Sequence, residues 1–311
     1  MAHLEELAAL VRSSPALHDK RDLSAVRRLP AAASDGDDGA LVRHGDGWLV
    51  LCAEAIAPRF CEMDPFGAGA ACVATNVADV RAMGGTPLAL VDTVVSPDRA
   101  HAERVLDGIA WASELFGVPA VGGHLTIGAA PAVSAAITGV ARTPLRASAA
   151  RPGDVLLAAF CLEGEYRAAG PYFSSLRTRD PGLLATDGEP IVAAAEAGLV
   201  HAARDVSMPG VAGSLLQMIE LAGCGATLDL DRLPRPEGVA LERWLQTFPS
   251  FGFVFAARPE VAGAAAALFT RRGLACAACG TFDDGHALRL AAGGSVAGVW
   301  DLAEEPLTGL G

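Results

Sequence analysis

Residues 36–54 read GDDGALVRHGDGWLVLCAE, and this stretch decides how the first part of the chain folds. Two apolar runs, 40–43 and 48–53, flank the tetrapeptide His44-Gly45-Asp46-Gly47. Glycines permit the positive φ angles that hairpin turns require. The pattern therefore predicts a β-hairpin whose open end carries carboxylates.

Those carboxylates belong to Asp37, Asp38 and Glu54. If the strands fold back at the turn, Asp37 or Asp38 comes to lie opposite Glu54 within one residue of register. Opposed side chains in a hairpin sit about 5 Å apart, and like charges there are destabilising. A Mg²⁺ ion held together with phosphate would relieve the repulsion, because Mg²⁺ takes one or two protein carboxylates and completes its shell with water and substrate oxygens. The alternative is a simple turn, since Asp-Gly pairs form turns widely and a second one occurs at 283–285.

The next informative segment is 67–83, which has helical spacing and stops at Gly84-Gly85. Asn76 and Asp79 are three residues apart and so share a helix face. The adjoining face is apolar, and the small residues of 67–71 would let another backbone approach closely. A polar face exposed to solvent is the alternative for Asn76 and Asp79.

The remainder of the chain alternates between strand and helix patterns, which predicts an α/β (α+β) protein. The short stretch 142–152 is the best boundary, giving expected domains at 1–146 and 147–311, each of ordinary domain size. Further strands are expected at 88–95, 131–140, 155–160, 226–230, 251–256, 274–280 and 287–290. Further helices are expected at 97–116, 191–203, from the loop 205–210 to about 221, and at 259–272, with a loop at 122–124.

Composition excludes several classes of function. The formal net charge of the 311 residues is -12, and Lys20 is the only lysine, so binding to nucleic acid or to an anionic membrane is not expected. The longest run without a charged residue or histidine, 125–141, is too short and too polar to cross a membrane. The N-terminal residues lack an export signal and the seven cysteines lack disulfide spacing, which favours a cytoplasmic protein.

Six segments occur in an order and spacing that resembles the AIR synthase superfamily, which includes thiamine-monophosphate kinase and selenophosphate synthetase. They are Gly36-Asp37-Asp38-Gly39-Ala40, Cys52-Ala53-Glu54, Asn76 to Pro87, Gly122-Gly123, Arg151-Pro152-Gly153-Asp154 and Asp205-Val206-Ser207. The resemblance spans most of the chain, and 76–87 is its most specific part. It implies an ATP-using homodimer in which the first domains of two chains pair their sheets into a barrel, with carboxylate-bound Mg²⁺ holding the nucleotide.

The resemblance also implies roles for individual residues. Metal ligands are expected at Asp37, Asp38, Glu54 and Asp79; nucleotide contacts at Gly36, Asn76, Gly122, Gly123 and, through a flexible N-terminal arm, Lys20; a phosphate contact at Arg59; and catalytic or acceptor contacts at His124, Asp205 and Ser207. Phosphoryl transfer requires positioning and neutralisation of phosphate charge, which such residues can supply. The alternative for Asp205 and Ser207 is a helix N-cap.

Three departures from the thiamine-monophosphate kinase pattern bear on the reaction. His124 replaces the aspartate of Gly-Gly-Asp, and imidazole is a poor Mg²⁺ ligand. Met208 replaces the second aspartate of Asp-x-Ser-Asp-Gly, and 248–253 replaces a Gly-Glu-Asp-Tyr-Glu segment. The leading hypothesis is thus an ATP-dependent phosphotransferase, ligase or dehydratase acting on an unidentified small molecule. The alternatives are a catalytically weak nucleotide-binding scaffold and thiamine-monophosphate kinase itself.

Overall fold

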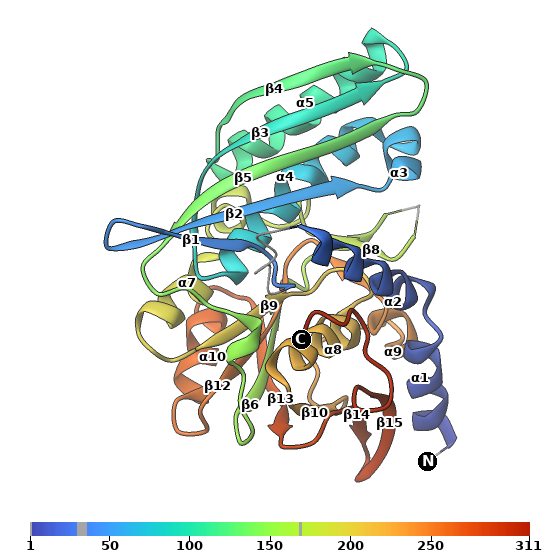
Figure 1. Cartoon of the computed structure of the whole chain (residues 1–311), viewed down its shortest axis with the longest axis vertical. Coiled ribbons are helices and arrows are strands. Elements are labelled where there is room, and N and C mark those ends of the chain that lie inside the picture. Colours follow the sequence, from blue (N-terminus) through green and yellow to red (C-terminus); the bar gives the residue numbers. More distant parts are fainter. Residues whose placement is uncertain (1, 30–35, 168–169) are drawn as a thin grey trace. The chain divides into compact units, whose positions relative to one another are not determined.

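The computed structural model describes residues 2–29, 36–167 and 170–311, and the chain divides into two compact α/β units (Figure 1). Unit 1 comprises Met1–Asp37, Leu145–Thr178 and Ala193–Gly311. Unit 2 comprises Asp38–Pro144 and Arg179–Val192. The mixed α/β class expected from the sequence is confirmed.

Unit 2 is built on a five-stranded sheet in the order β1-β2-β5-β3-β4. β1 and β2 form the predicted hairpin, whose ladder runs from Ala40 opposite Leu51 to His44 opposite Gly47. All neighbours are antiparallel except β3 and β4. The strands are β1 (Ala40–His44), β2 (Gly47–Ile56), β3 (Thr86–Ser96), β4 (Ala120–Ile127) and β5 (Ala132–Ala141).

Two long helices, α4 (Pro65–Ala82) and α5 (Arg99–Phe116), lie against each other and against this sheet. Their crossing is close because glycines stand at the contact: a Cβ on Gly69 would lie 2.1 Å from the Val105 carbonyl oxygen. A Cβ on Gly108 would lie equally close to the carbonyl oxygen of Phe66. The small residues at the start of the predicted helix do admit a second backbone. The shorter helices of the unit are α3 (Pro58–Met63) and α6 (Pro181–Leu184).

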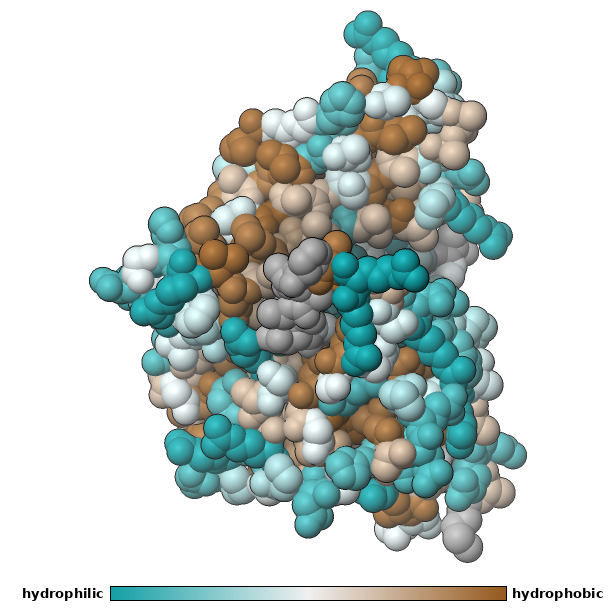
Figure 2. Space-filling view, viewed as in Figure 1, coloured by the Kyte–Doolittle hydropathy of each residue, from teal (hydrophilic) through white to brown (hydrophobic). Residues whose placement is uncertain are grey.

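The opposite face of this sheet carries exposed apolar side chains. Leu51, Val91 and Val121 are 41%, 45% and 65% exposed. They line a shallow groove of about 430 Å³ together with Ala136 and Thr138. Apolar residues gather on the visible surface of the same unit in Figure 2. A contiguous exposed apolar surface of this kind marks an interaction site in most proteins.

Unit 1 contains a seven-stranded sheet in the order β15-β14-β10-β13-β6-β12-β9 and a small sheet in the order β11-β8-β7. Helices α1 and α8 share a continuous apolar core with the large sheet, while α10 contacts β6 and β13. The strands are β6 (Val155–Phe160), β7 (Glu165–Tyr166), β8 (Tyr172–Ser174), β9 (Ala202–Asp205), β10 (Gly225–Asp229), β11 (Phe248–Pro249), β12 (Gly252–Ala257), β13 (Ala275–Asp283), β14 (Ala287–Ala292) and β15 (Ser295–Asp301). The helices are α1 (Ala2–Arg12), α2 (Pro15–His18), η1 (Asp19–Arg28), η2 (Ala147–Ala149), α8 (Val211–Ala222), α9 (Leu241–Trp244) and α10 (Ala262–Thr270), and α7 (Glu189–Glu196) begins in unit 2 and ends in unit 1.

Two local predictions are wrong. The expected helix 191–203 ends at Glu196, because Gly198 turns the chain at φ 68° and Ala202 begins the buried strand β9. The expected loop 122–124 is instead part of β4, which pairs with β3 over 122–127. In both places the residues are small and give little local preference, so pairing with a neighbouring strand decides the conformation.

In the described part of the chain, no helix combines the length and apolar character needed to cross a membrane.

Candidate functional site

Helix α4 presents Cys72, Asn76 and Asp79 on successive turns of one side. Asn76 is completely buried, and its amide nitrogen donates to the Cys72 carbonyl oxygen at 2.8 Å. The Oδ1 atom of Asn76 makes no hydrogen bond. A buried amide oxygen without a donor is costly to maintain, and a bound cation or ligand donor at this point would remove the cost.

Asp79 and Asp38 lie together beside this helix. A carboxylate oxygen of one lies within 4.8 Å of a carboxylate oxygen of the other. Asp79 is only 4% exposed, and two carboxylates so close repel each other unless a positive charge compensates them. Oxygen ligands of this type suit Mg²⁺, so the pair fits the metal that the sequence predicts.

The hairpin itself contributes to the site differently from the expected geometry. Its ladder ends at the pair Ala40 and Leu51, so Asp37 and Asp38 lie beyond the paired residues. Asp38 is instead close to Asp79 on α4. Asp37 accepts a hydrogen bond at 2.9 Å from the backbone nitrogen of Ala147.

A row of residues crosses the sheet of unit 2 and includes two further carboxylates. Glu54 on β2 and Asp92 on β3 both pair with Ala135 of β5, and Asp92 pairs with Gly123 of β4. Residues paired across strands point to the same face, and Ala135 is buried. The negative charges of Asp92 and Glu54 act on Cys72, whose pKa is raised to about 12, mainly by burial. Glu54 and Asp92 therefore belong to the face of the sheet that meets α4.

Asp92 is not among the residues that the sequence predicts for the site. Burial raises the pKa of its carboxyl group. A Cβ on Gly123 would lie 2.5 Å from both Asp92 carboxylate oxygens, so the Asp92 side chain lies over this glycine and would have to move if it were replaced. The available signal was a lone charge within an otherwise apolar strand, 88–95, which is unusual in a buried sheet.

His124 and Gly122 lie on β4 on the other side of the sheet from Asp92. His124 pairs with Thr93, and Gly122 pairs with Val91, whereas Asp92 pairs with the intervening Gly123. Since alternate residues of a strand point to opposite faces, His124 belongs to the open apolar face. His124 is exposed there.

In unit 1, Asp205 and Ser207 lie at the connection from β9 to α8. Asp205 ends β9 and is 4% exposed. The backbone nitrogen of Ser207 donates to Ser214 Oγ at 3.1 Å. The N-cap of α8 is Gly210, which provides no side-chain cap, so the N-cap alternative for Asp205 and Ser207 is wrong.

The first residue of the Gly-Asp-Asp stretch is anchored in the same unit. The Gly36 carbonyl oxygen accepts a hydrogen bond at 3.0 Å from Nη1 of Arg204, the residue before Asp205. Gly36 has φ 65°, a left-handed conformation that favours glycine. No local pattern in the sequence points to Arg204, because its partner Gly36 lies 168 positions away.

Lys20 and Arg59, the two basic residues expected to contact phosphate, both lie on helical segments. Lys20 is half-buried in η1 of unit 1, where the neighbouring Arg21 pairs with Glu305 and lies over the Trp300 ring. The expected flexible arm is thus a 3₁₀-helical segment held to β15 at this point. Arg59 is exposed on α3 of unit 2.

Family models match the chain over both of its halves. The AIR synthase related protein N-terminal domain matches residues 36–141, and the corresponding C-terminal domain matches residues 175–293. The chain belongs to the AIR synthase related family.

Among its relatives in this family, an uncharacterized protein of Synechocystis is 37% identical over 276 residues, covering 88% of this chain and 86% of that protein. The selenide, water dikinase of Myxococcus xanthus is 30% identical over 249 residues, covering 75% of this chain and 70% of the dikinase. The structure of Thermotoga maritima PurL complexed with ATP superimposes with a TM-score of 0.83 over 98% of this chain. Identity to that PurL is 22%, which establishes the shared fold, and this chain spans about half of it, 52%.

Proposed function

We propose that this AIR synthase related chain is an ATP- and Mg²⁺-dependent enzyme that transfers the γ-phosphoryl group of ATP to a small acceptor. The transfer would occur either as a kinase reaction or as activation of an amide-like oxygen. The observation that carries the proposal is the close approach of the Asp38 and Asp79 carboxylates beside the buried Asn76. One relative is named a selenide, water dikinase, and one fold neighbour was solved with ATP, which supports the same class of chemistry.

The residues of unit 2 fit a hard cation: Asp38 and Asp79 would hold it, and Glu54 and Asp92 would serve as further oxygen donors. Asp37, which precedes Asp38 in the chain, is a proposed ligand on the resemblance alone. Bound Mg²⁺ supplies neutralisation of the polyphosphate charge. Asn76 provides a fixed amide dipole at the same helix face, because its own amide nitrogen is anchored on Cys72. Of the three glycines expected at the nucleotide, Gly122 leaves room for a phosphate chain, because a Cβ built there would meet nothing within 4 Å, whereas a Cβ on Gly36 or Gly123 would be crowded.

We assign the acceptor side to Asp205 and Ser207. A carboxylate at Asp205 can accept a proton from an acceptor hydroxyl or amide, and the Ser207 hydroxyl can hold the acceptor in line. Lys20, Arg59 and His124 remain candidates for phosphate contacts: each can donate hydrogen bonds to anionic oxygens.

A nucleotide-binding protein without turnover is the second candidate, and two positions favour it. His124 and Met208 stand where carboxylates occur in the thiamine-monophosphate kinase pattern. Fewer oxygen ligands would hold fewer ions, which would permit nucleotide binding but weaken transfer.

Measurement of ATP consumption beside nucleotide binding separates these functions. The protein is titrated with the non-hydrolysable analogue AMPPCP, and ADP formation is followed with a panel of small acceptors that includes thiamine monophosphate. We expect AMPPCP binding that disappears on removal of Mg²⁺ with EDTA, and ADP formation that one class of acceptor stimulates at least about 10-fold. Binding without ADP formation for any acceptor would favour the non-catalytic protein, and the absence of Mg²⁺-dependent binding would contradict both.

We further propose that the open apolar face of the sheet in unit 2 is covered by the same face of a second copy. The exposed side chains Leu51, Val91 and Val121 and the groove between them support this assignment. Burying such a surface against its own copy removes apolar area from water, and each 100 Å² of it contributes about 2.5 kcal/mol before the cost of association.

Replacing Val91 with glutamate is expected to convert the protein to monomers, because two charges would be brought into each apolar interface. Sedimentation velocity should then give the chain mass of 31.7 kDa in place of twice that mass. Val296→Glu, at a valine of β15 that is 57% exposed in unit 1, serves as the control and should remain dimeric. A monomeric wild-type protein, or a dimeric V91E, would overturn the assignment.

A further inference from the structure

Arg204 is a buried cation that joins two stretches of the candidate site. It precedes Asp205 on β9 and is only 6% exposed. Its Nη1 donates to the Gly36 carbonyl oxygen at 3.0 Å, and its Nη2 donates to Gln217 Oε1 at 3.3 Å. Burying a guanidinium is costly, so its hydrogen-bond partners are held in place by strong electrostatic attraction.

The backbone of Arg204 is itself rigidly placed. β9 pairs with β12, with Arg204 opposite Val254 and Asp205 opposite Phe253, and both of these partners are buried. Gln217 lies on α8, the helix that follows the Asp205–Ser207 loop. The Arg204 side chain therefore connects the large sheet, to which its backbone belongs, with helix α8, to which it is hydrogen-bonded.

Gly36 has little freedom at the other end of this contact. A Cβ at this residue would lie 3.1 Å from side-chain atoms of both Leu221 and Leu310. The segment that includes Leu310 is in turn held by Glu220, whose carboxylate accepts hydrogen bonds from three consecutive backbone nitrogens, those of residues 307, 308 and 309. The Gly36 peptide is thus fixed from one side by apolar contact and from the other by the Arg204 guanidinium.

The peptide that Arg204 orients leads directly into Asp37 and Asp38. Asp37 is held a second time through its hydrogen bond from the Ala147 backbone nitrogen. Phosphoryl transfer depends on a fixed separation between the groups that hold the phosphates and those that hold the acceptor, and a displacement of about 1 Å can cost about 100-fold in rate. Arg204 is linked to both sets of residues: its backbone continues into Asp205, and its side chain holds the peptide before Asp37 through a hydrogen bond.

We infer that Arg204 is a positioning residue that holds the Gly36–Asp37 peptide in place relative to the Asp205–Ser207 loop, both within unit 1. The inference rests on the proposed function. It implies that loss of the guanidinium impairs Mg²⁺-dependent nucleotide binding and ATP turnover without any contact between Arg204 and the ligands.

The test compares Arg204→Met and Arg204→Lys with the wild-type protein in full-length form. The Mg²⁺ concentration that gives half-maximal AMPPCP binding is expected to rise at least about 10-fold in R204M. R204K should lie between R204M and wild type, because an ammonium can donate to the Gly36 carbonyl oxygen but cannot also reach Gln217 with a planar fork. The kcat for ATP should fall by about 100-fold in R204M, with a smaller change in KM.

Arg289→Met is the control, since Arg289 likewise makes a 3.0 Å hydrogen bond through Nη1 in unit 1, there to the carboxylate of Asp283. Its Mg²⁺ midpoint should equal that of the wild type. Should R204M fail to fold, R204K decides the matter. Variants that unfold at lower temperature but keep the wild-type Mg²⁺ midpoint and kcat would overturn the positioning role while leaving the proposed function intact. A wild-type protein without Mg²⁺-dependent binding would overturn both.

Discussion

Asp79→Asn is expected to weaken Mg²⁺-dependent binding of AMPPCP by at least about 100-fold. The substitution preserves shape and removes one of the two negative charges that lie within 4.8 Å of each other. Truncating one partner of a buried charge interaction costs about 2–5 kcal/mol, and every 1.4 kcal/mol is about 10-fold in affinity. Isothermal titration calorimetry at saturating Mg²⁺ measures the change directly.

Thermal stability should separate this loss from misfolding. Asp79 is buried beside Asp38, so the neutral side chain relieves repulsion in the metal-free protein and the unfolding temperature should barely change. Asp107→Asn, at an exposed position on α5, is the control for the chemical change and should bind nucleotide normally. An unchanged nucleotide affinity in D79N would contradict the assignment of the metal site to this helix.

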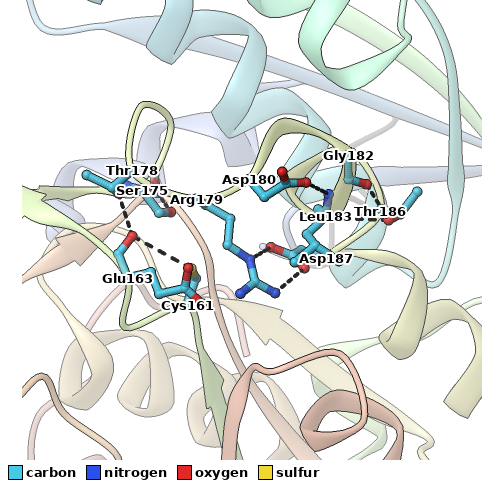
Figure 3. Close-up of polar contacts among 11 residues, drawn as sticks. Cys161, Glu163, Ser175, Thr178, Arg179, Asp180, Gly182, Leu183, Thr186 and Asp187 are labelled. Atoms are coloured by element: carbon cyan, nitrogen blue, oxygen red, sulfur yellow. Dashed lines mark hydrogen bonds and ion pairs between the residues drawn. The ribbon is translucent and has the colours of Figure 1, made fainter.

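Arg179→Met is expected to lower the free energy of unfolding by about 3–5 kcal/mol. Arg179 and Asp187 form a buried ion pair with two hydrogen bonds, Nε to Oδ2 at 3.0 Å and Nη2 to Oδ1 at 3.1 Å (Figure 3). Their side chains are 2% and 0% exposed. Removal of one partner takes this ion pair away from the other charge while that charge stays buried, which is the costly way to break such a pair.

Loss of this ion pair should also affect the candidate site, because the pair links the two ends of a short segment, 179–187, whose neighbouring residue Gly188 packs against α4. Within 179–192, a Cβ on Gly188 would lie 2.8 Å from Cγ of Arg81, two residues beyond Asp79. Burial lowers the pKa of Arg81, and the nearby Glu189 opposes that effect. Loosening this segment should therefore weaken AMPPCP binding as well as stability.

Chemical denaturation of R179M, D187N and the double variant provides the measurement. The double variant should lose less than the sum of the single losses, because each single loss already includes the interaction between the two residues. Arg99→Met removes a partner of an exposed pair with Glu103 and should leave the unfolding transition where it is. Wild-type stability in R179M would show that the pair does not hold the segment.

The sequence predicts the secondary structure of unit 2 well where local patterns are strong. The hairpin 40–53 has turn glycines between two apolar runs, and β1 and β2 form there. The helix 67–83 has a clear period and a glycine stop, and α4 spans Pro65–Ala82. Membership of the AIR synthase superfamily, inferred from motif order, is confirmed by the two family models.

The arrangement of the site depends on contacts that no local pattern contains. The hairpin ladder begins only at Ala40, so Asp38 is not paired with β2 and lies near Asp79. Continued pairing along the hairpin would have placed Asp38 close to Glu54. Asp92 joins the site through pairing across three strands, which alternation within a single strand cannot reveal. The ion pair of Arg179 and the tether of Arg204 connect residues through the folded structure, so their partners are invisible in the sequence.

We propose that Asp38 and Asp79 hold a divalent cation together with ATP. Crystals grown with AMPPCP and Mn²⁺ in place of Mg²⁺ test it directly, because manganese gives an anomalous signal that locates each ion. We expect an anomalous peak within about 2.5 Å of carboxylate oxygens of both Asp38 and Asp79, with triphosphate oxygens in the remaining coordination positions. Bound AMPPCP with no anomalous peak at these two carboxylates would show that Asp38 and Asp79 do not hold the metal ion.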